Sequence, residues 1–269
     1  MPDILKSSAF VISGQDLGES DRLITFYTMA RGKVRGIAKG AKRSRRRFVN
    51  ALEPFTMLNL SLALPRTTGL NRIDSTEILD NFPQLRHKVE CYIMASLCCE
   101  LVNLWTKEDD LQKNLFKLLR WYFSSLNDGF HPKKTTLFFK TLLLALAGYA
   151  PDFDQCLLCK KPPMGHHVVF KLHAGGFICS GCRKAGEKTH KISLGTLKSL
   201  RHIQKGPLDN LHRLTMTDAV LEEAWSLMKS LHCHHLEQVP ASYVAVNGLK
   251  LEIGNSWGNE KSEFPISIF

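Results

Sequence analysis

Residues 1–80 alternate between apolar and polar positions in short runs that glycines separate. A period of two residues is that of a half-buried β-strand, and glycine-rich breaks are typical of turns. The clearest run is 56–62, where leucine occupies every second position. The pattern predicts strands at residues 9–13, 23–28, 33–38, 55–64 and 70–75. Five short strands fit a small closed barrel of the OB-fold type, although an SH3-like barrel has almost the same strand count.

From residue 81 onward the apolar positions recur with the period of an α-helix. They predict helices over 89–104, 111–126 and 131–148, and the third is apolar on nearly every side, as a central helix would be. The cysteines within the first of these helices, Cys91, Cys98 and Cys99, are expected to be small core residues.

Later segments carry weaker signals. Ser193 and Thr217 are typical N-cap residues and predict two further helices. The pair Asn247-Gly248 favours a type I′ turn, which predicts a hairpin over 243–253.

These patterns together predict an α+β multidomain protein. An OB-fold domain would span 1–80, a helical domain 81–239 with an insertion at 152–190, and a tail of unclear structure 240–269. No apolar run approaches the roughly 18 residues that cross a bilayer, and the first residues do not resemble a secretion signal. We therefore expect a cytoplasmic protein with no membrane partner.

Two CxxC pairs, separated by nineteen residues, carry the clearest chemical signal: Cys156, Cys159, Cys179 and Cys182. Each short spacing lets two thiolates point at one ion about 2.3 Å away, and residues 168–178 read as a hairpin that brings the pairs together. Four thiolates leave no open coordination position, so the pattern predicts one structural Zn²⁺. Two disulfides would need an oxidising compartment, and a redox-active CxxC usually occurs as a single pair. The histidines of the segment, at positions 166, 167 and 173, are expected to be solvated.

The formal net charge is +11, and much of it lies in residues 31–47. This block has no acidic residue and predicts contacts with nucleic acid through Arg31, Lys33, Arg35, Lys39, Lys42, Arg43, Arg45, Arg46 and Arg47. A disordered tail or a targeting signal is the alternative. The block instead alternates charged with apolar or small residues over 33–36, as a half-buried strand does. Arg66 and Arg72 are weaker additions, and Phe48 and Phe55 are either stacking platforms or barrel core.

No enzyme motif accompanies this charge. The sequence has no P-loop, no H-E-x-x-H and no G-x-S-x-G, which predicts a protein that is not an enzyme. Asp152 and Asp154 are a pair that can bind Mg²⁺, but after a helix such a pair usually caps or is solvated. The cluster His232 to His235 is expected to lie at the surface, because consecutive helical positions cannot all face one ion.

The N-terminal motif Gly18-Glu19-Ser20-Asp21-Arg22, followed by Gly32-Lys33 and by Ala38-Lys39-Gly40, resembles the start of the bacterial RecO family. The order of barrel, helices and inserted cysteine pairs resembles that family too, over roughly residues 3–235. The chain departs from the pattern at its end, where 237–269 carries acidic residues instead of a basic helix.

The resemblance implies binding of single- and double-stranded DNA, annealing of complementary strands, and cooperation with RecR in loading RecA. It also implies that the tail of single-strand-binding protein docks on the helical body, and that the protein lies with the nucleoid. Lys133, Lys134 and Lys140 flank the most apolar helix, but we assign no partner site to them. The alternatives are an RNA-binding protein with the same barrel and zinc ribbon, and a Mg²⁺-dependent DNA-processing enzyme.

Overall fold

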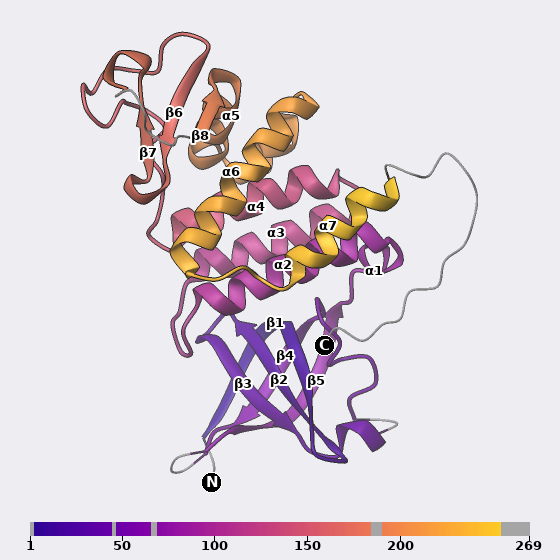
Figure 1. Ribbon diagram of the computed structural model, residues 1–269. Coiled ribbons are helices and arrows are strands. Elements are labelled where there is room, and N and C mark those ends of the chain that lie inside the picture. The colour runs from indigo at the N-terminus through magenta and orange to yellow at the C-terminus, as the bar shows by residue number, and fades with distance from the viewer. Residues whose placement is uncertain (1–2, 45–46, 66–68, 184–189, 254–269) are drawn as a thin grey trace. The chain divides into compact units, whose positions relative to one another are not determined.

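The structure is a computed structural model that describes residues 3–44, 47–65, 69–183 and 190–253 (Figure 1). The chain forms two compact units, Met1–Gly129 with Pro240–Phe269, and Phe130–Val239. The α+β class is confirmed, while the predicted division into residues 1–80, 81–239 and 240–269 remains a prediction. No helix within the described ranges is long and apolar enough to cross a membrane.

The first unit begins with a closed barrel, as the alternating pattern predicts. Its strands are β1 (Ile4–Leu17), β2 (Asp21–Thr28), β3 (Gly32–Ala38), β4 (Met57–Ala63) and β5 (Asn71–Asp80). They follow the order β1-β2-β3-β5-β4 and close between β4 and β1. All neighbours are antiparallel except β3 and β5, which pair in parallel. The five-stranded, OB-like barrel is confirmed.

Alternation along the strands places one face inside the barrel. Leu58, Leu60 and Leu62 of β4 are buried in a cluster with residues from every strand. Phe48, from the loop after β3, is buried in the same cluster. Phe55 is also fully buried, with its ring 5.1 Å from that of Tyr92. Both phenylalanines therefore belong to the core, and their use as stacking platforms is wrong.

Helices α1 (Pro83–His87), α2 (Val89–Trp105), α3 (Lys113–Asn127) and α7 (Ser242–Ile253) complete this unit. Phe10 of β1 lies 4.9 Å from Phe116 and 5.4 Å from Phe123 of α3, so an aromatic cluster joins the barrel to the helices. The predicted hairpin over 243–253 is wrong, because these residues form α7.

The reason for α7 lies far away in the sequence. The carboxylate of Glu100 in α2 accepts hydrogen bonds from the backbone N–H groups of Ala241 (2.7 Å) and Ser242 (2.8 Å). An acidic group at this position satisfies free N–H groups and suits the helix dipole. Tyr243 and Val246 are buried, so the helix also gains apolar contacts that a local turn preference cannot offset.

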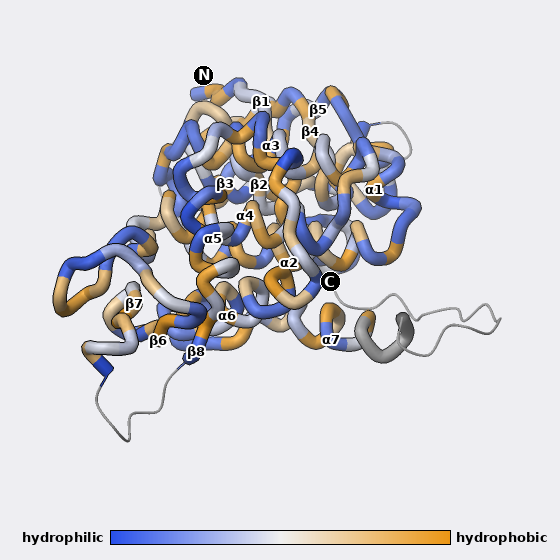
Figure 2. Tube along the Cα trace, turned by 90° about the horizontal axis from the view of Figure 1, so that it is seen from above, coloured by the Kyte–Doolittle hydropathy of each residue, from blue (hydrophilic) through white to orange (hydrophobic). Residues whose placement is uncertain are grey.

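The second unit has two parts. Its helices are α4 (Pro132–Leu146), α5 (Leu194–Lys205) and α6 (Asp218–Leu236), and its small sheet contains β6 (His167–Lys171), β7 (Gly176–Ile178) and β8 (His190–Ser193) in the order β7-β6-β8. Short 3-10 turns cover Ala41–Arg43 (η1) in the first unit and Leu172–Ala174 (η2), Ser180–Cys182 (η3) and Leu208–Arg213 (η4) in the second. Figure 2 shows orange and blue segments that alternate along these elements.

Both predicted caps of this unit are confirmed. The Ser193 side chain accepts from the Thr196 N–H at 3.1 Å, and Thr217 accepts from the Val220 N–H. Helix α4 is as apolar as its sequence indicates, and even Lys140 is fully buried, with Nζ 4.0 Å from the centre of the Trp225 ring.

Candidate metal centre and nucleic-acid interface

The four predicted ligand cysteines converge. The first pair lies in a turn closed by the Cys156 N–H donating to the Lys161 carbonyl (2.8 Å), and the second lies in η3. The hairpin of β6 and β7 joins the pairs, and the Leu157 N–H donates to the Phe177 carbonyl at 2.8 Å. All four Sγ atoms consequently lie within 4.8 Å of one another.

This geometry fits a tetrahedral ion. A tetrahedron with metal–sulfur bonds of 2.3 Å has sulfur–sulfur edges of about 3.8 Å, and the Sγ atoms of Cys159 and Cys179 are 3.7 Å apart. The Cys179 N–H also donates to Cys156 Sγ (3.3 Å), as expected around a thiolate. Burial raises the pKa of the Cys156 thiol, but backbone N–H donors outweigh it and hold the pKa at about 6. The site can hold one metal ion.

The predicted basic block is confirmed as a strand that leads into a loop, and the structure divides its charges into two sets. The first set is Arg31, Lys33 and Arg35, at the start and middle of β3. Arg31 pairs with Asp109 at 3.0 Å, and Arg35 pairs with Glu108. Lys33 Nζ donates to the Asn103 carbonyl at 2.7 Å. This set faces the loop between α2 and α3.

A close backbone approach holds these partners in place. The Asp109 N–H donates to the Lys33 carbonyl at 2.9 Å. Gly32 has φ +70°, and a Cβ at this position would lie 1.9 Å from the Asp110 carbonyl oxygen, so only glycine fits. The first set is therefore held against three acidic residues, 108–110, that neutralise it.

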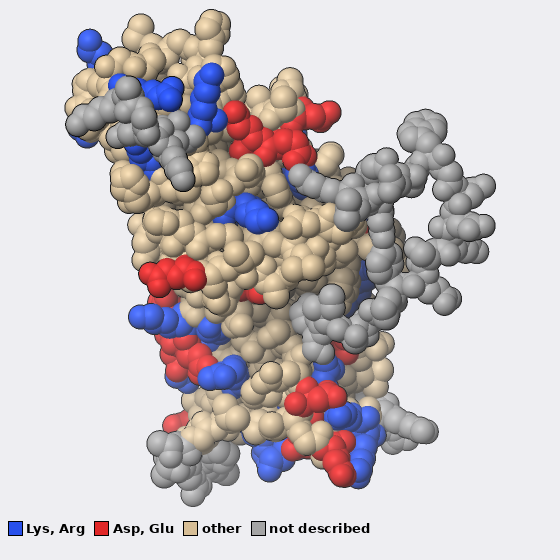
Figure 3. Space-filling model, viewed as in Figure 1, with Lys and Arg blue, Asp and Glu red and all other residues tan. Residues whose placement is uncertain are grey.

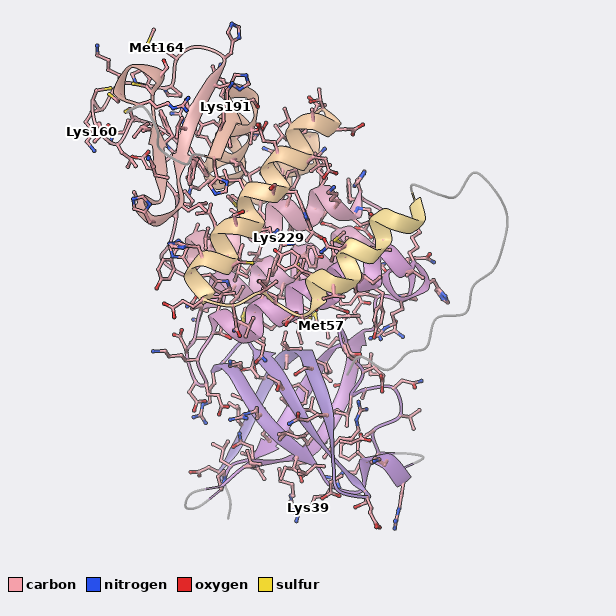
Figure 4. All side chains as sticks on the ribbon, in the orientation of Figure 1. Lys39, Met57, Lys160, Met164, Lys191 and Lys229 are labelled. Atoms are coloured by element: carbon pink, nitrogen blue, oxygen red, sulfur yellow. The ribbon has the colours of Figure 1, made fainter. Side chains whose placement is uncertain are left out.

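The second set lies after β3, in residues 39–47, which we call the barrel loop. Figure 4 places Lys39 at the end of the barrel opposite α2 and α3. Lys39, Lys42 and Arg43 are exposed, and the four residues from Arg35 to Lys39 span about 13 Å along β3. Lys42 reaches Asp16 at 2.7 Å, and Arg43 lies 3.8 Å from Glu19. Arg45 and Arg46 lie outside the described residues, as does Arg66.

Asp21 positions the barrel loop, a role that the sequence reasoning missed. Its carboxylate accepts from the Gly40 N–H at 2.8 Å and from the Ser20 hydroxyl at 2.9 Å. These bonds lower the pKa of Asp21. The Lys42 N–H also donates to the Ser20 carbonyl at 3.0 Å. The motif that resembles the RecO family thus supplies the acceptors that fix the loop.

The last residue of the block serves the barrel itself. The Arg47 guanidinium donates to the carbonyls of Ile73 (2.9 Å) and Asp74 (2.7 Å) and lies 4.8 Å above the Phe48 ring. Arg72 lies 3.6 Å from Asp74. Both arginines therefore bind residues of β5, to which Arg72 itself belongs.

The remaining polar candidates have structural partners. Asp152 accepts from the N–H of Asp154 (2.8 Å), so it caps its own turn, and Asp154 pairs with Arg201 and Lys205. The surface prediction is wrong for His232, which is fully buried on the inner side of α6. Its Nε2 lies 3.0 Å from the Lys140 carbonyl, and burial is the main cause that lowers its pKa to about 3.

An OB-like barrel with a basic loop and a four-cysteine site fits a nucleic-acid-binding protein, and comparisons with known proteins define the family. The family description "Recombination protein O N terminal" matches residues 1–82, and "Recombination protein O C terminal" matches residues 86–242. The chain belongs to the RecO family of DNA repair proteins.

Several relatives carry the name "DNA repair protein RecO". The one from Syntrophus aciditrophicus is 32% identical over 235 residues, covering 86% of this chain and 90% of the relative. The one from Myxococcus xanthus is 33% identical over 228 residues, covering 85% and 91%. The one from Thermoanaerobacter is 27% identical over 250 residues, covering 92% and 98%. The relationship thus spans the barrel, the helices and the cysteine site.

Proposed function

We propose that this chain binds single- and double-stranded DNA, anneals complementary strands, and cooperates with RecR to load RecA onto coated single strands. Membership of the RecO family supports a role in DNA repair. The observation that carries the proposal is the barrel loop, where exposed cations stand on a rigid barrel and Asp21 fixes the backbone.

The proposed mechanism requires no bond chemistry. Two DNA strands repel each other through their phosphates, and a cationic surface that neutralises phosphates of both strands removes much of that barrier. Contacts to phosphate carry no sequence information, so annealing should depend little on base composition. We infer that the chain acts as a mediator and not as an enzyme.

The proposed cofactor is one structural Zn²⁺ on Cys156, Cys159, Cys179 and Cys182. Four sulfur ligands at tetrahedral spacing suit zinc, and they leave no position for substrate. In the proposal the ion folds the segment that surrounds it. The other proposed partners are RecR and the tail of single-strand-binding protein, and the proposed location is the cytoplasm, with the nucleoid.

An annealing assay tests the proposal. Complementary oligonucleotides coated with single-strand-binding protein are mixed with the chain, and duplex formation is followed by fluorescence quenching. We expect the intact chain to accelerate annealing, and replacement of Arg45, Arg46 and Arg47 by alanine to reduce the rate. Since Arg47 also bonds β5, the paired variant R45A/R46A separates DNA contact from barrel stability.

Two outcomes would contradict the proposal. The first is an unchanged annealing rate at low salt in R45A/R46A, which would remove the barrel loop from the mechanism. The second is a preference for RNA over single-stranded DNA in competition at fixed salt, together with no annealing. That result would favour an RNA-binding protein with the same architecture.

A further inference from the structure

The net positive charge of the chain is confined to two segments. Residues 31–47 hold nine Lys and Arg and no acidic residue, and residues 156–205 hold ten Lys and Arg against Glu187 alone. The rest of the chain carries seventeen Lys and Arg against twenty-four Asp and Glu, so it is acidic. A second basic segment therefore exists that the proposed function does not use.

The second segment forms the cysteine site, the sheet of β6 to β8, and helix α5 in the second unit. We call its basic surface the ribbon face; its described Lys and Arg residues are Lys160, Lys161, Lys171, Arg183, Lys191, Lys198, Arg201 and Lys205. Figure 3 shows blue side chains over the cysteine segment with no red side chain among them. Figure 4 labels Lys160 and Lys191 on this segment, and both side chains are exposed.

Few carboxylates reach these cations. Among the described residues, Arg201 and Lys205 share Asp154, each at 2.5 Å, and Lys160, Lys161 and Lys191 are exposed with no ion pair. Four thiolates and a divalent metal would together carry a charge of about −2, which offsets only part of the excess. The ribbon face stays strongly cationic.

Helix α5 arranges part of this charge in a row. Lys198, Arg201, His202 and Lys205 are exposed and occupy positions i, i+3, i+4 and i+7, so they share one side of the helix. Like charges at this spacing destabilise a helix, and Asp154 screens only Arg201 and Lys205 of the row. From Lys198 to Lys205 the row is about two helical turns, or about 10 Å, long, and it matches the repeated charge of a polynucleotide backbone.

The helix that carries this row is firmly anchored. Glu223 of α6 accepts from the Ser193 N–H (2.9 Å) and the Ser193 hydroxyl (2.6 Å), and it also binds the Thr196 hydroxyl. Burial raises the pKa of Glu223, but these hydrogen bonds outweigh it and lower the pKa. The start of α5 is thus fixed at the end of β8.

We propose that the ribbon face is a second phosphate-binding surface, which holds a nucleic-acid strand separately from the barrel loop. The inference rests on the proposed function and deepens it, because annealing requires two strands on one molecule. The ligand class is a phosphodiester backbone read without regard to sequence. One strand bound on each unit would give the chain two sites, each able to hold a short single strand.

The stoichiometry of a short probe tests this inference. An oligothymidylate of about six nucleotides cannot anneal to itself and is short enough for one site. Native mass spectrometry of the full chain should show two bound. The variant K161E/K191E/K198E should bind one, and K39E/K42E/R43E should also bind one. Loss of three phosphate contacts should weaken the affected site on the order of 100-fold at 0.1 M salt.

A matched control removes the effect of net charge. The variant K113E/K117E/R120E changes three exposed cations of α3 and should still bind two probes. Metal content and melting temperature of the ribbon variant should equal those of the intact chain, since none of its three side chains forms an ion pair with another described residue.

The outcomes separate the two proposals. No probe on the intact chain would overturn the proposed function. One probe on the intact chain, retained by K161E/K191E/K198E, would overturn the second surface alone. If K161E/K191E/K198E still binds two probes but no longer binds an acidic peptide, the second phosphate-binding surface is also overturned. That result would assign the ribbon face to an acidic protein segment.

Discussion

The two sets of cations in residues 31–47 should contribute unequally to DNA binding, although the sequence predicts DNA contacts for both sets. We compare the variant K39Q/K42Q/R43Q, in the barrel loop, with R31Q/K33Q/R35Q, at the start and middle of β3. Binding to single-stranded DNA is the measurement, and its dependence on salt is the quantity that distinguishes the sets.

The magnitude follows from the ion pairs. Each phosphate contact with a single strand contributes about 0.7 to the slope of log K against log salt. Lys39, Lys42 and Arg43 are exposed, although Lys42 pairs with Asp16 and Arg43 lies 3.8 Å from Glu19. Both carboxylates are themselves well exposed, so a DNA phosphate can compete with them. Loss of the three cations should flatten the slope by about 1 to 2 and weaken binding on the order of 10- to 100-fold at 0.1 M salt. Arg31 and Arg35 already form ion pairs with Asp109 and Glu108, so the variant R31Q/K33Q/R35Q should change the slope by less than about 1.

Fluorescence anisotropy titrations between about 0.05 and 0.5 M salt give both slopes. Because R31Q/K33Q/R35Q also removes contacts with the loop after α2, affinities are compared per folded molecule, with the folded fraction from circular dichroism. A slope that flattens equally in both variants would refute the division of the block into a set held against residues 108–110 and an exposed set in the barrel loop.

Three further predictions concern the rest of the chain. Replacing Cys156 by serine should abolish binding of one metal ion, measured by atomic absorption. The substitution should also lower the melting temperature more than it lowers DNA affinity per folded molecule. Equal metal content in the variant and the intact chain would contradict the four-cysteine site. The pKa of His232 is about 3 in the folded chain, against an ordinary value of 6.5. Between these two pH values only the unfolded chain binds this proton, so the folded state loses stability as the pH falls from 6.5 towards 3. Between pH 7 and pH 4.5, the free energy of unfolding should therefore fall by about 1–3 kcal/mol less for H232N than for the intact chain. Substitution of the exposed His234 is the control. Parallel curves of stability against pH for H232N and the intact chain would contradict this prediction. E100A should destabilise α7 by about 1 kcal/mol, seen as faster hydrogen exchange over 242–253 and not elsewhere.

Periodicity identified the main elements because burial of one face decides where strands and helices form. The five strands, the long helices and the caps at Ser193 and Thr217 all depend on local sequence. The same holds for the cysteines, since two tight turns and one hairpin are local structures and place the four Sγ atoms together.

The failures have a common physical cause, which is contact between residues distant in the sequence. Asn247-Gly248 favours a turn by itself, but the Glu100 carboxylate and the burial of Tyr243 stabilise a helix there. Likewise, no local pattern reveals that Glu108 and Asp109 neutralise part of the basic block more than 70 residues away, or that His232 packs inside.

The metal site and the ribbon face are linked by the size of the sheet between them. Strands β6, β7 and β8 have five, three and four residues, and a two-stranded hairpin as short as that of β6 and β7 is only marginally stable in water by itself. In the proposal, binding of a metal ion to the four cysteines adds to the stability of this hairpin and holds Lys160 and Lys161 in the turn between the first two ligands and β6. Removing the metal should therefore abolish the second oligonucleotide and spare the one on the barrel loop, because the barrel has its own core. A metal-free chain that keeps both oligonucleotides would show that the ion does not present the ribbon face.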